Sequence, residues 1–335
     1  MAEFMKSKLK ERILRVVLLL SVGMFLSLAA ATYYSAGPTL ACLMPASGRV
    51  RVGISARTLV SGGRRRCYLV YVPAAHDAAH PSAVLLALHG FAGNAGGLRS
   101  IAVWEPVADR EDFVVAYPDG SSFPLRWNIG PAANIPEVDD IQFMRDTIAD
   151  LSTTVSVDRA RIYVAGFSNG GQMAHRIACR MADEIAAVGI VDGIDGGMLD
   201  ECFPSRPMPV MGFFGTANPL AGVSYPVWFQ YLVNVRLEEG PPLPANVIDL
   251  WLKQWADRNG CHQPAHPLPA TTKTTGIRYE GCQNAADVVL YRVEGQGHAW
   301  PGGPALPLLG DSVSDINASE VMWTFFQQHP LAHDP

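Results

Sequence analysis

Residues 161–170, which read RIYVAGFSNG, decide the fold of this chain. Residues 162–167 form an apolar run with aromatic and β-branched side chains, which is typical of a buried strand. A helix is expected over residues 169–181, so Gly166-Phe167-Ser168-Asn169-Gly170 is a G-x-S-x-G motif between a strand and a helix. Such a turn holds the serine Oγ at the carboxyl end of a sheet. The motif therefore predicts that Ser168 is a nucleophile.

Strands and helices alternate on both sides of this motif. Strands are expected at residues 49–60, 67–72, 83–88, 113–117, 186–191, 209–214 and 288–293. Further helices are expected at residues 139–155, 247–258 and 319–328, and an aspartate pair at the start of the first can cap it. The alternation predicts an α/β fold with a mostly parallel central sheet and helices on both faces. A single catalytic domain over residues 37–335 is the simplest interpretation.

The composition excludes several classes of protein. Of the 335 residues, 49% are apolar and 17% are charged, which excludes a disordered chain and a coiled coil. The first 15 residues hold five basic and two acidic side chains, so they carry +3 and the remainder carries −8 within a net charge of −5. Because no basic stripe remains, nucleic acid is not an expected partner. Arg64-Arg65-Arg66 is interpreted as a solvated strand edge.

Residues 1–36 are predicted to be a signal peptide or an N-terminal membrane anchor. A basic start precedes residues 16–31, which are all apolar or small and would approach the thickness of a bilayer core as a helix. Ala29-Ala30-Ala31 and Tyr34-Ser35-Ala36 offer small residues to signal peptidase. A buried core helix is the third alternative. The expected location is secreted or periplasmic, with membrane contact only through an uncleaved anchor.

The six cysteines agree with export. None of them forms a C-x-x-C pair, so we expect neither a structural zinc site nor any other metal. An even number in an exported protein suggests disulfides, and Cys179–Cys202 and Cys261–Cys282 are the natural local pairs. Each would close a loop of about twenty residues, worth about 3 kcal/mol. A Cys42–Cys67 pair is weaker, and buried thiols are the alternative.

A serine nucleophile needs a base and an oxyanion hole. His298 follows the last expected strand, in a glycine-rich loop that can bring its imidazole to the sheet end, and is the expected base. One oxyanion donor is expected from the backbone N–H of Asn169. The other is expected from Phe91, in the loop His89-Gly90-Phe91-Ala92-Gly93-Asn94 after the strand at 83–88. His89 is interpreted as a structural support of that loop.

Five blocks of sequence resemble a known family. They are LHGFAGNAG (88–96), YPDG followed by Trp127, VDDIQFM (138–144), VDRARIYVAGFSNGGQMA (157–174) and GQGHAWPGG (295–303). The blocks are similar to those of extracellular polyhydroxybutyrate-depolymerase-like esterases, which group with feruloyl and acetylxylan esterases in the α/β-hydrolase superfamily. The resemblance covers about residues 50–330. It implies the α/β-hydrolase fold, a Ser-Asp-His triad, no cofactor, and the same two local disulfides.

The triad acid departs from the family pattern. The family places it after the seventh strand in a segment resembling HGTAD, whereas this chain reads Phe214-Gly215-Thr216-Ala217-Asn218. No acidic residue occurs between residues 203 and 236. Three interpretations stay open. The acid is Asp192 (or Asp195) after the preceding strand, Asn218 orients His298 directly, or the protein is a degenerate scaffold that binds a ligand in the cell envelope.

Aromatic side chains are expected near the cleft. They are Phe91, Trp127, Tyr225, Trp228, Phe229 and Trp300, of which Trp127 and Trp300 are predicted to bind substrate. Such a lining suits an extended or aromatic acyl ester, such as a feruloyl group or a polyester (hydroxyalkanoate) chain. The family resemblance adds acetyl esters, so the expected substrate is a small or polymeric ester. The sequence therefore predicts a secreted serine carboxylic-ester hydrolase that works through an acyl-enzyme. A peptidase could use the same catalytic triad, but the family resemblance favours an esterase.

Overall fold

The computed structural model describes residues 50–77, 79–122, 124–130, 135, 137–193, 202–218, 246–306 and 309–332. Its strands are β1 (Gly53–Ser61), β2 (Arg64–Val72), β3 (Ser82–Leu88), β4 (Phe113–Pro118), β5 (Val157–Phe167), β6 (Ala187–Val191), β7 (Val210–Gly215), β8 (His266–Leu268), β9 (Thr274–Tyr279) and β10 (Val288–Val293). Its helices are α2 (Ala95–Ala102), α3 (Glu105–Glu111), α4 (Asp140–Ser152), α5 (Asn169–Arg180), α7 (Val247–Arg258) and α8 (Ala318–Gln327), and a short 3₁₀ turn covers Gln283–Ala285.

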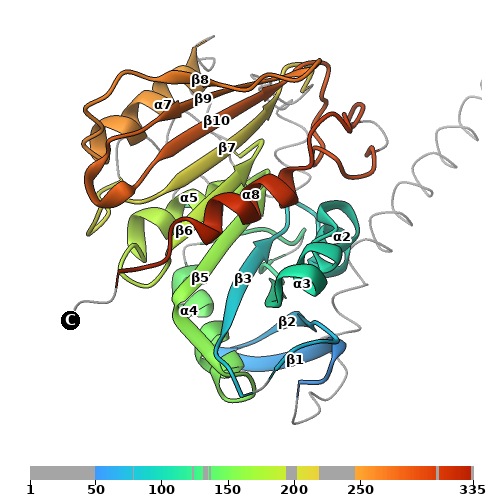
Figure 1. Cartoon of the computed structure of the whole chain (residues 1–335). Helices are drawn as coiled ribbons and strands as arrows, with labels where there is room; N and C mark the ends of the chain where they lie inside the picture. Colours follow the sequence, from blue (N-terminus) through green and yellow to red (C-terminus); the bar gives the residue numbers. More distant parts are fainter. Residues whose placement is uncertain are drawn as a thin grey trace, which may run out of the picture.

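All the described strands belong to a single twisted sheet, in the order β1-β2-β4-β3-β5-β6-β7-β10-β9-β8 (Figure 1). The six strands from β4 to β10 run parallel to their neighbours. The two strands at each edge are added antiparallel. The predicted α/β-hydrolase fold, with its mostly parallel sheet, is confirmed.

Helices cover both faces of this sheet, and the alternation of side chains along each strand explains why. In β3, Val84, Leu86 and Leu88 enter one apolar core, which also holds residues of α4, α5 and α7. The intervening residues of β3 enter a second core, which holds residues of α2, α3 and α8. Because β3 is buried on both faces, its sequence is continuously apolar rather than alternating.

The predicted elements differ from the structure at a few places. Helices α2 and α3 were not expected, because they are short and hold glycine, proline and charged residues. Strands β8 and β9 were also missed, since they lie at the sheet edge and are half-exposed. The expected cap of α4 is confirmed, because the Asp139 side chain accepts a hydrogen bond from Gln142 N.

The predicted N-terminal segment, residues 1–36, lies outside the described residues. None of the helices described is long and apolar enough to cross a membrane. That residues 37–335 form one catalytic domain stays a prediction.

Candidate active site

Ser168 lies at the sharp turn between β5 and α5. Its backbone has φ 54° and ψ −121°, a left-handed conformation that non-glycine residues rarely adopt. Two glycines make this turn possible, because a Cβ on Gly166 would lie 2.0 Å from Gly170 O, and one on Gly170 would lie 2.2 Å from Leu88 O. The predicted elbow is thus present, with the half-buried Ser168 at the carboxyl end of β5.

His298 is held in the loop after β10. Its backbone N–H donates to Leu309 O at 2.7 Å, and the preceding Gly297 N–H donates to Asp311 O at 2.8 Å. The imidazole packs against the ring of Phe167, the residue before Ser168, with ring centroids 4.8 Å apart. The ring is 4% exposed, and this burial lowers the pKa of His298 to about 4. His298 is therefore neutral at pH 7, as a general base must be.

Two residues face Nδ1 of His298. The side-chain nitrogen of Asn218 lies 3.0 Å from it, and a carboxyl oxygen of Asp192 lies 3.7 Å from it. Asp192 follows β6 in a left-handed conformation, with φ 48°, and its other oxygen accepts a hydrogen bond from Gly215 N at 3.1 Å. Both interpretations of the acid therefore place their residue beside the same imidazole nitrogen.

Burial favours the uncharged forms of both Asp192 and His298. Burial raises the pKa of Asp192 to about 8, although hydrogen bonds from Gly215 and Asn218 oppose the rise. Burial lowers the pKa of His298, so both shifts disfavour a charged pair across the 3.7 Å contact. An imidazolium formed during a reaction would change this, because a nearby positive charge favours the carboxylate.

The orientation of the Asn218 amide is linked to which nitrogen of His298 carries the proton. When its NH₂ group donates to Nδ1, the proton of the neutral ring lies on Nε2, which then cannot accept a proton. The basic tautomer needs the proton on Nδ1 and an acceptor facing it. The amide oxygen of Asn218 or the carboxyl of Asp192 can supply that acceptor.

The two predicted oxyanion donors come from segments that meet at Ser168. Asn169 begins α5, so its backbone N–H belongs to the positive end of that helix. Phe91 lies in the loop after β3, and a Cβ added to the neighbouring Gly90 would lie 3.1 Å from the Cβ of Ser168. The loop therefore runs against the serine.

His89 supports this loop, in agreement with its predicted structural role. Its Nδ1 donates to Gly90 O at 2.7 Å, and its Nε2 accepts a hydrogen bond from Gly120 N at 2.9 Å. The side chain is 1% exposed, and burial lowers its pKa to about 4. Both ring nitrogens are occupied, so His89 has no proton-transfer role in this arrangement.

The predicted substrate contacts Trp127 and Trp300 are both buried in this structure, so their contact with a substrate stays a prediction. Trp127 is 0% exposed, and its indole N–H donates to His89 O at 2.8 Å. Trp300 is 1% exposed, and its indole N–H donates to the hydroxyl of Ser319 at 3.0 Å. Both rings fill the core beneath the loops, because their size and single donor suit an apolar site with one polar partner. Tyr225, Trp228 and Phe229 lie outside the described residues.

Both predicted local disulfides are present, Cys179–Cys202 and Cys261–Cys282. The first ties α5, which begins at the nucleophile turn, to the segment before β7. His175 lies beside this disulfide in the one group of possible metal ligands within the described chain. Because its two cysteines are bonded to each other, they offer no thiolates to a metal. Cys42 and Asp195 lie outside the described residues.

The sequence interpretation missed Arg66. It was expected in a solvated edge, but it is 5% exposed and forms an ion pair with Asp140, which is 1% exposed. The period of two along β2 could have revealed this, because Arg66 shares a face with Tyr68, Val70 and Val72, which all enter the core.

Comparisons with known proteins place this chain among esterases. The family described as esterase PHB depolymerase matches residues 66–237. Feruloyl esterase B of Piromyces equi is 31% identical over 70% of this chain, and the chain spans 42% of that relative's length. Feruloyl esterase D of Neurospora crassa is 25% identical over 76% of this chain and 83% of its own. An acetyl xylan esterase from Aspergillus awamori superposes with a TM-score of 0.55 at 14% identity, covering 81% of this chain and 98% of that one, which supports the fold.

Proposed function

The chain belongs to the esterase PHB depolymerase family, and from that premise we propose that it hydrolyses carboxylic esters through an acyl-enzyme on Ser168. The observation that carries this proposal is the strained turn at Ser168, beside which His298 packs against Phe167. A serine held at positive φ next to a buried, neutral imidazole is the arrangement that nucleophilic ester cleavage needs.

The proposed reaction has two halves. Ser168 Oγ attacks the ester carbonyl while Nε2 of His298 takes its proton, and the backbone N–H groups of Phe91 and Asn169 hold the oxyanion. The C–O bond to the alcohol then breaks, and the alcohol leaves with the proton from His298. Water repeats the sequence on the acyl-enzyme and releases the acid and Ser168.

Asp192 is proposed as the residue that stabilises the imidazolium, with Asn218 as the group that orients the ring. Asp192 supplies a carboxyl within 3.7 Å of Nδ1, at the carboxyl end of β6. Asn218, at the position where the family has its acid, contacts Nδ1 but has no charge to offer. Asn218 would thus orient the imidazole and Asp192 would stabilise its positive charge. In a Ser-His-Asp triad a single aspartate does both.

The proposed substrates are esters of the feruloyl, acetyl or hydroxyalkanoate type. Two feruloyl esterases among the relatives and the family's own description support this class. We propose that the protein is exported, because both described disulfides would persist only in an oxidising compartment. The apolar segment at residues 16–31 supports the same location, as a signal peptide or an anchor.

A second candidate function is ligand binding by a scaffold that has lost turnover. The observation that favours it is the Asn218 amide on Nδ1, which can hold His298 in the non-basic tautomer.

Hydrolysis of p-nitrophenyl acetate, p-nitrophenyl butyrate and methyl ferulate by the purified full chain tests the proposal. We expect turnover in the wild type and none above background in Ser168→Ala. Reaction with a fluorophosphonate should label the wild type and spare the variant, since only an activated serine reacts quickly. Turnover that survives in Ser168→Ala would refute the assignment. An inert wild type would favour the binding scaffold.

A further inference from the structure

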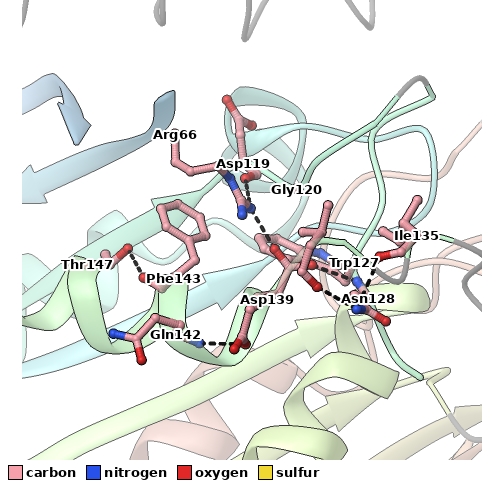
Figure 2. A network of polar contacts seen from close by, with 12 residues as sticks. Arg66, Asp119, Gly120, Trp127, Asn128, Ile135, Asp139, Gln142, Phe143 and Thr147 are labelled. Carbon is pink, nitrogen blue, oxygen red and sulfur yellow. Dashed lines mark hydrogen bonds and ion pairs between the residues drawn. The ribbon is translucent and has the colours of Figure 1, made fainter. Parts of the chain in front are cut away.

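A buried ion pair lies at the base of the loop that follows β4. The Arg66 Nη2 donates to an Asp140 carboxylate oxygen at 2.7 Å and to the backbone oxygen of Asp119 at 3.1 Å. The guanidinium also lies 3.8 Å from the centroid of the Phe143 ring. Figure 2 shows this arginine between the end of β4 and the start of α4. The pair therefore joins three segments that are far apart in sequence.

The second carboxylate oxygen of Asp140 fixes the other end of the same loop. It accepts a hydrogen bond from Asn128 N at 2.6 Å. The Asn128 side chain in turn donates to Val138 O at 2.5 Å and to Ile135 O at 3.3 Å (Figure 2). Arg66 and Asp140 thus hold residue 119 and residue 128 in place. We call residues 119–128 the 119–128 loop; residue 123 is outside the described part of the chain.

The 119–128 loop is closed on itself. Ser121 and Arg126 exchange two backbone hydrogen bonds, at 2.9 and 3.0 Å. Gly120 lies so close to Arg126 that a Cβ there would be 2.6 Å from its backbone oxygen. A displacement at the ends of the loop would therefore move the loop as a unit rather than be absorbed within it.

This loop contacts the segment that carries the first predicted oxyanion donor. Four hydrogen bonds join it to residues 89–95: Gly120 N to His89 Nε2 at 2.9 Å, Trp127 Nε1 to His89 O at 2.8 Å, Ala92 N to Leu125 O at 2.8 Å, and Ala95 N to an Asp119 carboxyl oxygen at 2.7 Å. Phe91 lies in the middle of this segment. Its backbone position follows from the position of the loop.

The same loop contacts the second predicted donor. Trp127 N donates to the side-chain oxygen of Asn169 at 2.8 Å, and Asn169 is the residue that directly follows Ser168. Trp127 therefore bonds one oxyanion segment with its indole and the other with its backbone. The spacing between the two donors depends on the loop, and oxyanion stabilisation depends on that spacing.

We propose that Arg66 and Asp140 are positioning residues for the oxyanion hole, which they set through the 119–128 loop. The inference rests on the proposed esterase function. A buried ion pair costs desolvation energy and is often no more stable than an apolar pair of the same volume. An apolar pair could not form hydrogen bonds with Asp119 O and Asn128 N. The ion pair therefore contributes to the position of the loop ends rather than to the free energy of unfolding.

A second ion pair on α4 provides a matched control. Arg57 in β1 binds Asp150 through two hydrogen bonds, at 2.6 and 2.8 Å. Asp150 lies ten residues after Asp140, which is about 15 Å along the helix. Tyr68 also donates to Asp150, at 2.7 Å. The control pair thus links the same helix to the neighbouring strands, and none of these partners belongs to the 119–128 loop.

The experiment compares Asp140→Asn with Asp150→Asn in the full chain. The carboxylate of Asp140 uses both oxygens as acceptors, whereas an amide at position 140 has only one oxygen. In either orientation the amide therefore loses the hydrogen bond from Arg66 or the one from Asn128. We expect kcat on p-nitrophenyl acetate to fall at least about tenfold in Asp140→Asn, with KM within about twofold, because small misplacements of catalytic groups are costly. Asp150→Asn should lower Tm and leave kcat within about twofold. The rate of fluorophosphonate labelling should follow kcat.

A second variant keeps the test informative if Asp140→Asn does not fold. Asn169→Ala removes the acceptor for Trp127 N but keeps its own backbone N–H, and it should also lower kcat more than KM. Equal kcat in Asp140→Asn and Asp150→Asn would overturn the inference while the esterase assignment stands, since wild type and Ser168→Ala decide that assignment. A wild type that neither hydrolyses esters nor reacts with fluorophosphonate would overturn both.

Discussion

The carboxyl of Asp192 lies 3.7 Å from Nδ1 of His298, on the nitrogen that the Asn218 amide also contacts at 3.0 Å. These side chains follow two different strands, since Asp192 comes directly after β6 and Asn218 lies three residues after β7. The imidazole therefore has a carboxyl and an amide where a triad usually has one carboxylate.

Asp192→Asn should lower kcat about 10²-fold on p-nitrophenyl esters. Loss of a directly bonded triad aspartate costs about 10⁴ in a serine protease, and the contact here is longer. The amide can still accept the hydrogen bond from Gly215 N, so the fold should hold. Steady-state kinetics check this, with Asp150→Asn as the control for a lost carboxylate elsewhere. A kcat within twofold of the wild type would exclude Asp192 as the acid.

Asn218→Asp should raise kcat, by about tenfold or more at pH 7. A carboxylate at this position would accept a hydrogen bond from Nδ1–H and hold His298 in its basic tautomer. It would also lie near Asp192, so one of the two carboxyls should stay protonated. The double variant Asn218→Asp/Asp192→Asn should keep the gain, whereas Asn218→Ala should lose activity. A fall in kcat for Asn218→Asp would contradict the proposed role of Asn218.

The pH profile of kcat should rise between pH 7 and pH 9. Burial lowers the pKa of His298 to about 4, so its deprotonation is complete well below this range. Burial raises the pKa of Asp192 to about 8, and only the ionised carboxylate stabilises an imidazolium. The rise should therefore follow Asp192 and should vanish in Asp192→Asn. Rates corrected for spontaneous hydrolysis, measured from pH 5 to pH 9.5, provide the check. A profile that is flat above pH 7 in the wild type would argue against this ionisation.

Trp127→Phe should lower kcat about threefold to tenfold and change KM little. The ring is fully buried and touches no solvent, but its N–H holds His89 O in the oxyanion loop. Trp255→Phe is the matched control, because Trp255 is equally buried and its indole N–H has no partner among the described residues. Both variants should lose stability, as Tm measurements would show. A large rise in KM for Trp127→Phe alone would instead support Trp127 as a substrate contact.

Much of the fold could be predicted from the sequence, because strands buried on both faces of a parallel sheet have continuous apolar sequences. The strands β3 to β7 and β10 and the helices α4, α5, α7 and α8 were all expected near their observed bounds. The short helices α2 and α3 and the edge strands β8 and β9 were not. Their formation depends on packing against the sheet, which short polar segments do not encode in their own pattern.

The turn at Ser168 could be predicted from the local motif, because a side chain at Gly166 would collide with the backbone of Gly170 four residues later. The need for glycine at position 170 comes from the tertiary structure, because a Cβ there would lie 2.2 Å from Leu88 O in β3. The local disulfides were set by short separations along the chain. The partners of His298 were decided by the tertiary structure, because Asp192 and Asn218 follow different strands and reach the same nitrogen. The same holds for Arg66, whose burial beside Asp140 arises from a pairing 74 residues apart. A sequence specifies which side chains can react; only the packed sheet brings distant ones within a few ångströms of each other.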